Sequence, residues 1–464
     1  MPDLSSTVLL ALSLYIVSSV YLLAMAAQRA RPPKNELDRP LFFVLVVPAL
    51  NEELVIGNTV RHLLSLRGDN YLVMVIDDGS DDQTAAAVEA FQTPRVRLIQ
   101  RRAPFARMGK GAALNFAYEA ILTSELPELY GEENIVMAVM DADGQVEADM
   151  LEQVAPYFAA PKTGAVQTGV RMLNASQNVF TRWQQYEFVT FNWIFSRARD
   201  AAGSGSLGGN GQFVRLSALA SLGNEPWSDN LTEDLDLGLR LMLKGWRNHY
   251  CHQTRVYQQA VVSFKRLVRQ RSRWYQGHLS CWKHIPGILL HDMPAYRKAD
   301  VLNYLLMPAL VIPMGVISII GVGSLLLGLL GVVPMVPMLG RSLPTGPAEW
   351  VEWYALGLGV APLFAYAIWR DRQTSFLAAL FWAHVFVLGS YIWFVAALIA
   401  VRRMLSGKVG WIKTARTPID GAPEIGNIIE SESRFLAARS GVRLADGSRE
   451  ILPLRIQNFV PGGD

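Results

Sequence analysis

The sequence predicts an α/β domain joined to an α-helical transmembrane region, and three observations support that fold class. In the middle of the chain, short apolar runs alternate with helical patterns, as they do in βαβ units. On both sides of this middle part lie apolar stretches long enough to cross a bilayer. Over all 464 residues, hydrophobic side chains make up 51% and charged side chains only 18%, which is too apolar for a soluble or a disordered chain.

Formal charge and cysteine content exclude two further classes of protein. The 43 basic and 40 acidic residues leave a net charge of +3, which is too small an excess for general nucleic-acid binding. The two cysteines, Cys251 and Cys281, cannot form the disulfide framework of a secreted mini-protein. We therefore expect no nucleic-acid partner, and the lipid bilayer is the first partner that the sequence implies.

Residues 1–28 are predicted to form a retained transmembrane anchor. Their one charged side chain is Asp3, and basic residues such as Arg29 and Arg31 follow the apolar run. A cleaved signal peptide would carry its basic residues before the run instead. By the positive-inside rule, the linker at 29–40 and the domain after it lie in the cytoplasm, which predicts an integral protein of the plasma (inner) membrane.

Residues 301–404 are predicted to form C-terminal transmembrane helices, followed by a polar tail at 405–464. The apolar blocks of this region are Val301–Leu339, Val351–Trp369 and Thr374–Val401. Basic residues flank the last block on both sides, so a single crossing would place the tail outside, yet Lys413 and Arg416 predict a cytoplasmic tail. The sequence leaves open whether this block is re-entrant, lies in the membrane plane or has one basic end on the other side. It also leaves open whether the first block holds two short helices that meet near Gly321–Gly323.

Acidic residues follow three predicted strands in the domain at 41–300. The strands are Phe42–Val47, Tyr71–Ile76 and Ile135–Met140, and the helical patterns between them are Leu54–Leu66, Thr84–Phe91 and Gly111–Leu122. Ligands of open α/β sheets bind beyond the carboxyl ends of the strands. Helix capping explains a single carboxylate at such a position, but three strand ends that carry carboxylates are harder to explain this way. We therefore expect a binding site that includes Glu52, Asp78, Asp141 and Asp143.

Two of these carboxylates suit a divalent metal. Asp141 and Asp143 lie on the same side of an extended segment, because side chains alternate with a period of two. Together with diphosphate oxygens they would form a hard, oxygen-rich site for Mg²⁺ or Mn²⁺. Lys110 lies between two glycines at a helix start, an arrangement that suits phosphate and is also found for plain solvated lysines.

Two helical segments supply further candidates. Thr232-Glu233-Asp234 opens a helix, and acidic residues there either complement the helix dipole or include a general base. On the predicted amphipathic helix Ser263–Trp282, the side chains of Gln270, Arg273 and Trp274 share one face. These side chains suit a sugar nucleotide, because a guanidinium binds phosphate with two hydrogen bonds and an indole stacks on a sugar ring. The simpler explanation is a basic helix at the membrane surface that contacts anionic lipid. The two explanations are compatible if they concern opposite faces of the helix.

In this order and between membrane segments, these motifs resemble those of a processive family 2 glycosyltransferase, the group of the cellulose, hyaluronan, chitin and poly-N-acetylglucosamine synthases. The resemblance covers roughly residues 41–280. It implies a GT-A (Rossmann-like) catalytic domain and an inverting transfer from a UDP-sugar bound with Mg²⁺ or Mn²⁺. It also implies a growing polysaccharide acceptor that is exported through the membrane, with accessory export proteins as further partners.

The resemblance also implies a role for each motif residue. Asp234 corresponds to the general base, and Gln270, Arg273 and Trp274 correspond to a gate at the acceptor and the pyrophosphate, so these three are called the gate residues below. Glu52, Asp78, Lys110, Asp141 and Glu233 correspond to donor- and substrate-binding positions, and Asp143 corresponds to the metal ligand.

Other functions share part of this pattern. A non-processive family 2 transferase that glycosylates a lipid acceptor would have the same donor site. A membrane transporter would need ionisable residues inside its spans, and only Glu352 and His384 qualify. The aromatic segment Thr181–Arg199 is predicted to lie in the membrane surface and to roof the site, although a core helix is the alternative.

Overall fold

A computed structural model of the chain describes residues 39–330 and 374–407 and, in short pieces between them, residues 335–336, 341–342, 346–347, 350–351, 354, 358 and 360–371. The predicted anchor at 1–28, most of the linker, and Lys413 and Arg416 of the tail lie outside the described residues.

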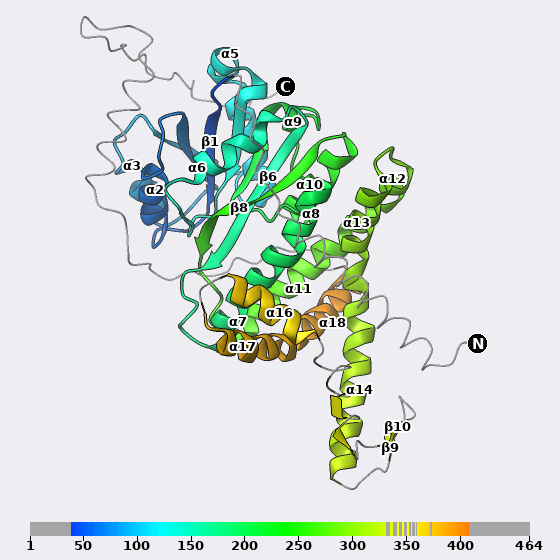
Figure 1. The fold of residues 1–464 in the computed structure, drawn as a ribbon. Helices are drawn as coiled ribbons and strands as arrows, with labels where there is room; N and C mark the ends of the chain where they lie inside the picture. Colours follow the sequence, from blue (N-terminus) through cyan, green and yellow to red (C-terminus); the bar gives the residue numbers. More distant parts are fainter. Residues whose placement is uncertain are drawn as a thin grey trace, which may run out of the picture.

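Eight strands form one mixed sheet at the centre of the molecule (Figure 1). Their order across the sheet is β3-β2-β1-β4-β7-β6-β8-β5. The strands are β1 (Phe42–Ala49), β2 (Tyr71–Asp77), β3 (Val96–Gln100), β4 (Ile135–Val139), β5 (Gln145–Val146), β6 (Thr163–Met172), β7 (Gln212–Arg215) and β8 (Arg247–Gln258). A separate two-stranded pair consists of β9 (Met335–Val336) and β10 (Arg341–Ser342).

The first half of the sheet is parallel, as the sequence predicts. β3, β2, β1 and β4 pair in parallel, so the carboxyl ends of these strands meet at one edge. The second half differs, because β7 runs antiparallel to both β4 and β6, and β5 runs antiparallel to β8. This curled, mixed extension of a parallel sheet is typical of a GT-A-like domain.

Helices cover both faces of the sheet. On one face, α2 (Ile56–Leu64), α3 (Thr84–Glu89) and α6 (Met150–Val154) share a hydrophobic core with side chains such as Leu45 and Val47 of β1. The other face is covered by α4 (Lys110–Leu122), α5 (Leu126–Tyr130), α9 (Leu216–Ala220) and α10 (Glu233–Leu243), which pack with Val44 and Val46. Consecutive β1 side chains thus enter opposite cores, as strand alternation requires.

A second group of helices lies below the sheet in Figure 1 and is called the helical layer here. Its members are α7 (Val179–Thr190), α11 (Phe264–Ser280), α16 (Ala361–Arg370), α17 (Phe376–Gly389) and α18 (Tyr391–Leu405). Val189 of α7 packs with Ala365 of α16 and Ala383 of α17, and these small alanines let the helices approach closely. A π-helical segment (Phe191–Ser196) and α8 (Arg197–Ala202) continue α7, so the predicted aromatic helix at Thr181–Arg199 exists but is interrupted.

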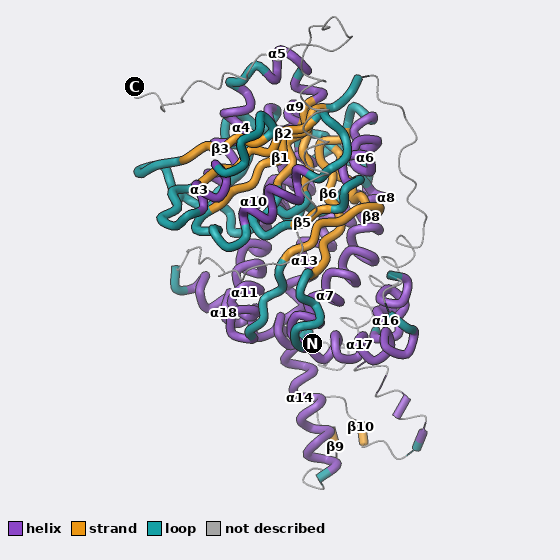
Figure 2. The backbone as a smooth tube through the Cα atoms, turned by 90° about the vertical axis from the view of Figure 1, so that its left-hand side faces the viewer, coloured by secondary structure: helices purple, strands orange, loops and turns teal. Residues whose placement is uncertain are grey.

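Three further helices follow α11, and short 3₁₀ helices complete the described elements. The helices are α12 (Ile285–Leu290), α13 (Ala295–Leu306) and α14 (Val311–Leu329), and the 3₁₀ helices are Glu132–Asn134 and Ala155–Ala159 within the domain, and Cys281–His284 and Met307–Leu310 after α11. Figure 2 shows α14 projecting beyond the helical layer. α14 runs without a break across Gly321–Gly323, so the alternative of two short helices meeting there does not hold.

Two stretches of the described residues are long and apolar enough to cross a membrane, Ala295–Ile320 and Phe376–Leu405. The second stretch divides at Ser390 into α17 and α18. The 14 residues of α17 span only about 21 Å at 1.5 Å per residue, which is shorter than a hydrocarbon core of about 30 Å. α17 also packs on α16 and α7.

Candidate active site

The loops that follow β1 and β2 are tied together by polar side chains. Asn51 has a left-handed backbone, with φ of 53°, and its Nδ2 donates to Asp81 Oδ1 at 2.5 Å. The Asn51 backbone N–H donates to Ser80 Oγ at 2.9 Å, and that of Glu52 donates to Thr84 Oγ1 at 2.7 Å. These bonds fix Glu52, which is buried, beside the carboxyl end of β2.

Asp78, directly after β2, pairs with an arginine that the sequence prediction did not include. Arg101 follows β3, and its Nη1 donates to Asp78 Oδ1 at 2.5 Å. Both side chains are buried. Burial raises the pKa of Asp78 although the guanidinium of Arg101 opposes the shift. An arginine at the end of β3 could have been found from sequence only if that strand, Val96–Gln100 with its internal Arg97, had been recognised.

Lys110 meets Asp141 across the strand ends. Lys110 is the first residue of α4, and its Nζ lies 2.7 Å from Asp141 Oδ1. Burial alone would lower the pKa of Lys110, but the carboxylates of Asp141 and Glu233 outweigh it and raise the pKa to about 12. The lysine is therefore a fixed positive charge at neutral pH, placed where several carboxylates converge.

The Asp141-Ala142-Asp143 turn is held from several sides. Asn210 Oδ1 accepts a hydrogen bond from the Asp141 backbone N–H at 3.1 Å. The Asp143 side chain is fully buried, and its Oδ2 accepts from the Gln259 backbone N–H, after β8, at 3.0 Å. Thr59 of α2 donates to the Ala142 carbonyl at 2.6 Å. These bonds hold the turn to three separate segments of the domain.

The residues present fit a divalent metal only with help from a ligand. Within the described part of the chain, no group of three or more His, Cys, Asp or Glu side chains could hold a metal ion. The Asp143 carboxylate is an oxygen donor of the kind that Mg²⁺ and Mn²⁺ prefer, and Mg²⁺ in particular is commonly shared between one or two carboxylates and substrate phosphates. Asp143 and a donor diphosphate would make such a shared site, with Asp141 next to it.

The side chains of Asp234 and Lys110 both approach Gly209. A β-carbon built on Gly209 would be 3.1 Å from Asp234 Oδ2 and 3.3 Å from Lys110 Nζ, and the φ of Gly209 is +77°. Only glycine suits both the backbone conformation and the space. Burial, together with the neighbouring charge of Glu233, raises the pKa of Asp234 to about 7. This carboxyl is therefore a stronger base than an ordinary aspartate.

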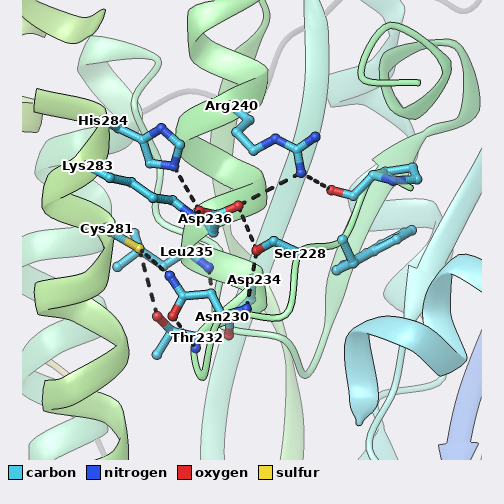
Figure 3. A network of polar contacts seen from close by, with 12 residues as sticks. Ser228, Asn230, Thr232, Asp234, Leu235, Asp236, Arg240, Cys281, Lys283 and His284 are labelled. Atoms are coloured by element: carbon cyan, nitrogen blue, oxygen red, sulfur yellow. Dashed lines mark hydrogen bonds and ion pairs between the residues drawn. The ribbon is translucent and has the colours of Figure 1, made fainter. Parts of the chain in front are cut away.

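A third carboxylate of α10 anchors the helix start, as Figure 3 shows. Asp236 is fully buried and has three close partners, which are Ser228 Oγ at 2.8 Å, His284 Nε2 at 2.8 Å and Lys283 Nζ at 2.9 Å. Burial alone would raise the pKa of Asp236, but these partners outweigh it and hold the pKa well below its usual range. Asp236 thus locks the first turn of α10, which carries Asp234, against the segment after α11.

Replacing Asp236 with asparagine is expected to destabilise the fold by roughly 2–4 kcal/mol, because a buried charge is removed while its partners stay. Thermal unfolding of the purified protein in detergent measures the effect. The matched control is Asp229→Asn, an exposed carboxylate in the same loop, which should leave the midpoint unchanged.

The stability that Asp236 contributes should also depend on pH. Because its low pKa belongs to the folded state, this stability should be lost as the pH falls towards and below 4. Equal midpoints for the two variants would contradict this anchoring role.

The gate helix α11 lies against the start of α10. A β-carbon on Gly277 would be 2.7 Å from the Thr232 backbone nitrogen, so glycine is required for the two segments to approach this closely. Burial raises the pKa of Glu233, while the charges of Lys110 and Arg273 oppose that shift, so both cations lie near this carboxyl. The positive charges of Lys110 and Arg273 therefore both lie near the start of α10, at Glu233. Gly277 was not predicted, because a close approach between distant segments leaves no local signal.

The other two gate residues are held by Arg271, which lies between them in the chain. Arg271 is fully buried, and its Nη1 donates to Gln270 Oε1 at 2.6 Å. Its guanidinium carbon lies 4.1 Å from the centre of the Trp274 ring. Trp274 is only half-buried and keeps part of its indole accessible.

Both the family match and the similar proteins identify this chain as related to glycosyltransferases. The model of the family described as "Glycosyltransferase like family 2" matches residues 40–277. Beta-monoglucosyldiacylglycerol synthase of Trichormus variabilis is 35% identical over 305 residues, which are 64% of this chain and 62% of that protein. The synthase of the same name from Synechocystis is 35% identical over 272 residues, 57% of this chain and 53% of that protein. The matches thus span less than two thirds of these relatives.

A solved structure supports the fold. The mannosyltransferase from Pyrobaculum calidifontis, in complex with GDP-Man and Mn²⁺, superimposes with a TM-score of 0.51 and covers 86% of this chain and 99% of that one. Only 16% of the residues are identical, so this likeness concerns the fold alone.

Proposed function

Because the chain belongs to glycosyltransferase family 2, we propose that it transfers a single sugar from a UDP-sugar to the hydroxyl group of a membrane lipid of the diacylglycerol class. That it is a glycosyltransferase follows from the family. The lipid acceptor is supported by the relatives at 35% identity, whose name describes a glucosylated diacylglycerol as the product. The β-linkage in that name also fits an inverting transfer, because common UDP-hexose donors are α-linked.

The processive reading of the sequence is less well supported. It rests on the gate residues Gln270, Arg273 and Trp274, on the carboxylate motifs and on flanking apolar segments. A lipid-glycosylating transferase uses the same donor site, and it also needs to work at a membrane. Synthesis of an exported polysaccharide, with accessory export proteins, is therefore the alternative outcome of the experiments below.

On the donor side, we propose that Glu52 and Asp78 border the nucleoside. Lys110 would face the diphosphate, with Asp141 beside it. Asp143 would hold the Mg²⁺ or Mn²⁺ together with the diphosphate, and the metal would neutralise charge on the leaving group. Positive charge at this position stabilises the negative charge that develops on the departing nucleoside diphosphate.

On the acceptor side, we propose that Asp234 is the general base, with Glu233 next to it as a substrate-binding residue. As the lipid oxygen forms its bond to the anomeric carbon, Asp234 accepts the hydroxyl proton and the bond to the UDP oxygen breaks. The burial that raises the Asp234 pKa to about 7 improves its basicity at neutral pH. Gln270 and Trp274 would contact the sugar, and Arg273 the pyrophosphate.

For the membrane, we propose an integral inner-membrane protein whose domain at 41–300 is cytoplasmic. The residues at 1–28 and the apolar stretch that includes α14 would cross the bilayer, and α17 would lie in its plane. Exposed apolar side chains on α17, such as Leu377 and Phe381, support a lipid-facing surface there. This arrangement offers a lipid acceptor a short path from the bilayer to the gate helix.

The pH dependence of the reaction tests the state of Asp234. A base must be deprotonated, so the rate constant should fall about tenfold per pH unit below its pKa of about 7 and level off above it. Values of kcat/KM for the acceptor between pH 5 and 9 give this profile, because kcat/KM reports the ionisation of the free enzyme. A rate that stays constant down to pH 5 would mean that the base has an ordinary carboxyl pKa.

The acceptor class is tested with purified protein in phospholipid vesicles. Single radiolabelled UDP-sugars are supplied with Mg²⁺ or Mn²⁺, in vesicles with and without diacylglycerol. We expect label in the organic phase with one preferred donor and only when diacylglycerol is present. Label that stays in the aqueous phase as a polymer sensitive to glycosidases would support the processive alternative instead.

A further inference from the structure

We propose that Arg271, Glu187 and Trp393 form a positioning triad. The triad holds the gate residues Gln270 and Trp274 in a fixed position relative to the helical layer. The proposal rests on the proposed function, since it concerns the acceptor side of the same site. The three residues come from three different helices, α11, α7 and α18. None of the three is among the site residues that the family resemblance implies.

Arg271 is the centre of the triad. Its guanidinium has no exposed surface, although it carries a full charge. One nitrogen, Nη1, donates to Gln270 Oε1 at 2.6 Å, and the face of the guanidinium covers the Trp274 ring at 4.1 Å. A buried guanidinium is costly unless it is paired, so its partner must compensate for the lost hydration.

Glu187 is that partner. Its two carboxylate oxygens accept from Arg271, Oε1 from Nε at 3.3 Å and Oε2 from Nη2, which is the fork geometry that an arginine makes with a carboxylate. Glu187 Oε1 also accepts from the indole Nε1 of Trp393 at 2.6 Å. The carboxylate therefore links α7 to both the gate helix and α18.

Trp393 completes the connection. Its ring lies 5.7 Å from the Arg271 guanidinium carbon and 6.5 Å from the Trp274 ring, so the two indoles border the charge on adjacent sides. Two aromatic faces around one cation restrict its position more than a single ion pair does. The orientation of Trp274 thus depends on where α18 holds Trp393.

α18 is in turn packed on the apolar helix α14. A β-carbon on Gly315 would lie 2.2 Å from the Phe394 ring, so the two helices are in close contact at this point. Tyr391 and Ser318 share a hydrogen bond of 2.5 Å across the same interface. A continuous set of contacts therefore runs from α14 through α18 to the gate residues, and the gate geometry depends on the seating of the apolar helices.

Trp393→Phe is the sharpest variant, because it keeps an aromatic ring and removes the N–H that Glu187 accepts. We expect the KM for the lipid acceptor to rise by about tenfold, the loss typical of a hydrogen bond to a charged group, while the affinity for UDP stays unchanged. Glu187→Gln should act in the same direction. If both variants disturb one unit, the effect of the double variant will be smaller than the product of the single effects.

The matched control is Trp183→Phe. Trp183 also lies in the helical layer and donates its indole N–H, to the Phe386 carbonyl at 3.2 Å, and it pairs with Phe386 rather than with Arg271. This variant should change the thermal midpoint as much as Trp393→Phe does without raising the acceptor KM. That difference separates positioning from general loss of stability.

Two results would overturn the triad. Unchanged acceptor kinetics in both Trp393→Phe and Glu187→Gln would show that the gate residues do not depend on it. A parallel loss of UDP binding and acceptor binding, also seen in Trp183→Phe, would show a merely structural role. Failure of the proposed function is visible separately, because the wild-type protein would then form no organic-phase product at all.

Discussion

Asp234→Asn is expected to lower the rate of sugar transfer by about 10³-fold, within the range measured for removal of a general base. The substitution keeps the size of the side chain and its ability to accept the Leu235 N–H, which lies 2.7 Å from Oδ1. UDP binding, measured by calorimetry in the presence of Mn²⁺, should stay within about threefold, because a base acts on the acceptor and leaves donor contacts intact.

Comparing UDP affinity with the transfer rate distinguishes a general base from a donor-binding residue. Glu233→Gln, the neighbouring carboxylate on the same helix turn, is the reference variant. The charge of Glu233 contributes to the raised pKa of Asp234, so its removal should shift the pH profile to lower pH and reduce the rate far less. If UDP affinity and rate fell together in Asp234→Asn, the residue would belong to the donor site and another group would be the base.

Asp143→Asn is expected to reduce metal-dependent donor turnover by at least about 100-fold, because a metal at the diphosphate supplies several kcal/mol of charge stabilisation. The asparagine can still accept the Gln259 N–H that Asp143 Oδ2 now accepts at 3.0 Å, so the turn should keep its shape. The dependence of UDP affinity on Mn²⁺ concentration should also disappear in this variant.

Asp149→Asn is the matched control, since that carboxylate lies in the same connection and accepts from Gln153 at 3.1 Å. It should leave both turnover and the Mn²⁺ dependence of UDP binding unchanged. Thermal unfolding checks that Asp143→Asn remains folded. A folded Asp143→Asn variant with wild-type turnover would show that the metal, if one is used, is held elsewhere.

Local patterns were sufficient for the parallel half of the sheet. β2 and β4 are fully buried, and β1 is buried except at Pro48, so all three are short uninterrupted apolar runs, and the acidic motifs follow them closely. The helix starts at Lys110 and Glu233 were also predicted within one residue. Here sequence order and spatial neighbourhood coincide, because parallel βα units repeat the same connection.

The antiparallel half of the sheet was not predictable in this way. β7 has only four residues and lies between β4 and β6, which are separated from it by long connections. The contacts that shape the site here, such as Gly209 between Asp234 and Lys110, join segments that are far apart in sequence. Nothing in the local composition identifies which glycine must be close to which carboxylate.

The helical layer shows a second limit of prediction from the sequence. The sequence indicated the face shared by Gln270, Arg273 and Trp274, but it could not show that Arg271 on another face holds two of them. That arrangement depends on Glu187 and Trp393, which approach α11 from helices about 80 residues before it and 120 after it. A buried arginine is identified only when the packing around it is known.

The number of sugars per acceptor tests the central claim most directly. Vesicles with excess diacylglycerol and limiting labelled UDP-sugar are incubated with the wild-type protein, and the products are sized by mass spectrometry at early times. Single transfer to a lipid predicts that almost every glycosylated product carries one hexose, while most of the diacylglycerol remains unused. Long sugar chains beside unused acceptor, at the same low turnover, would contradict this account and establish the protein as a processive polysaccharide synthase.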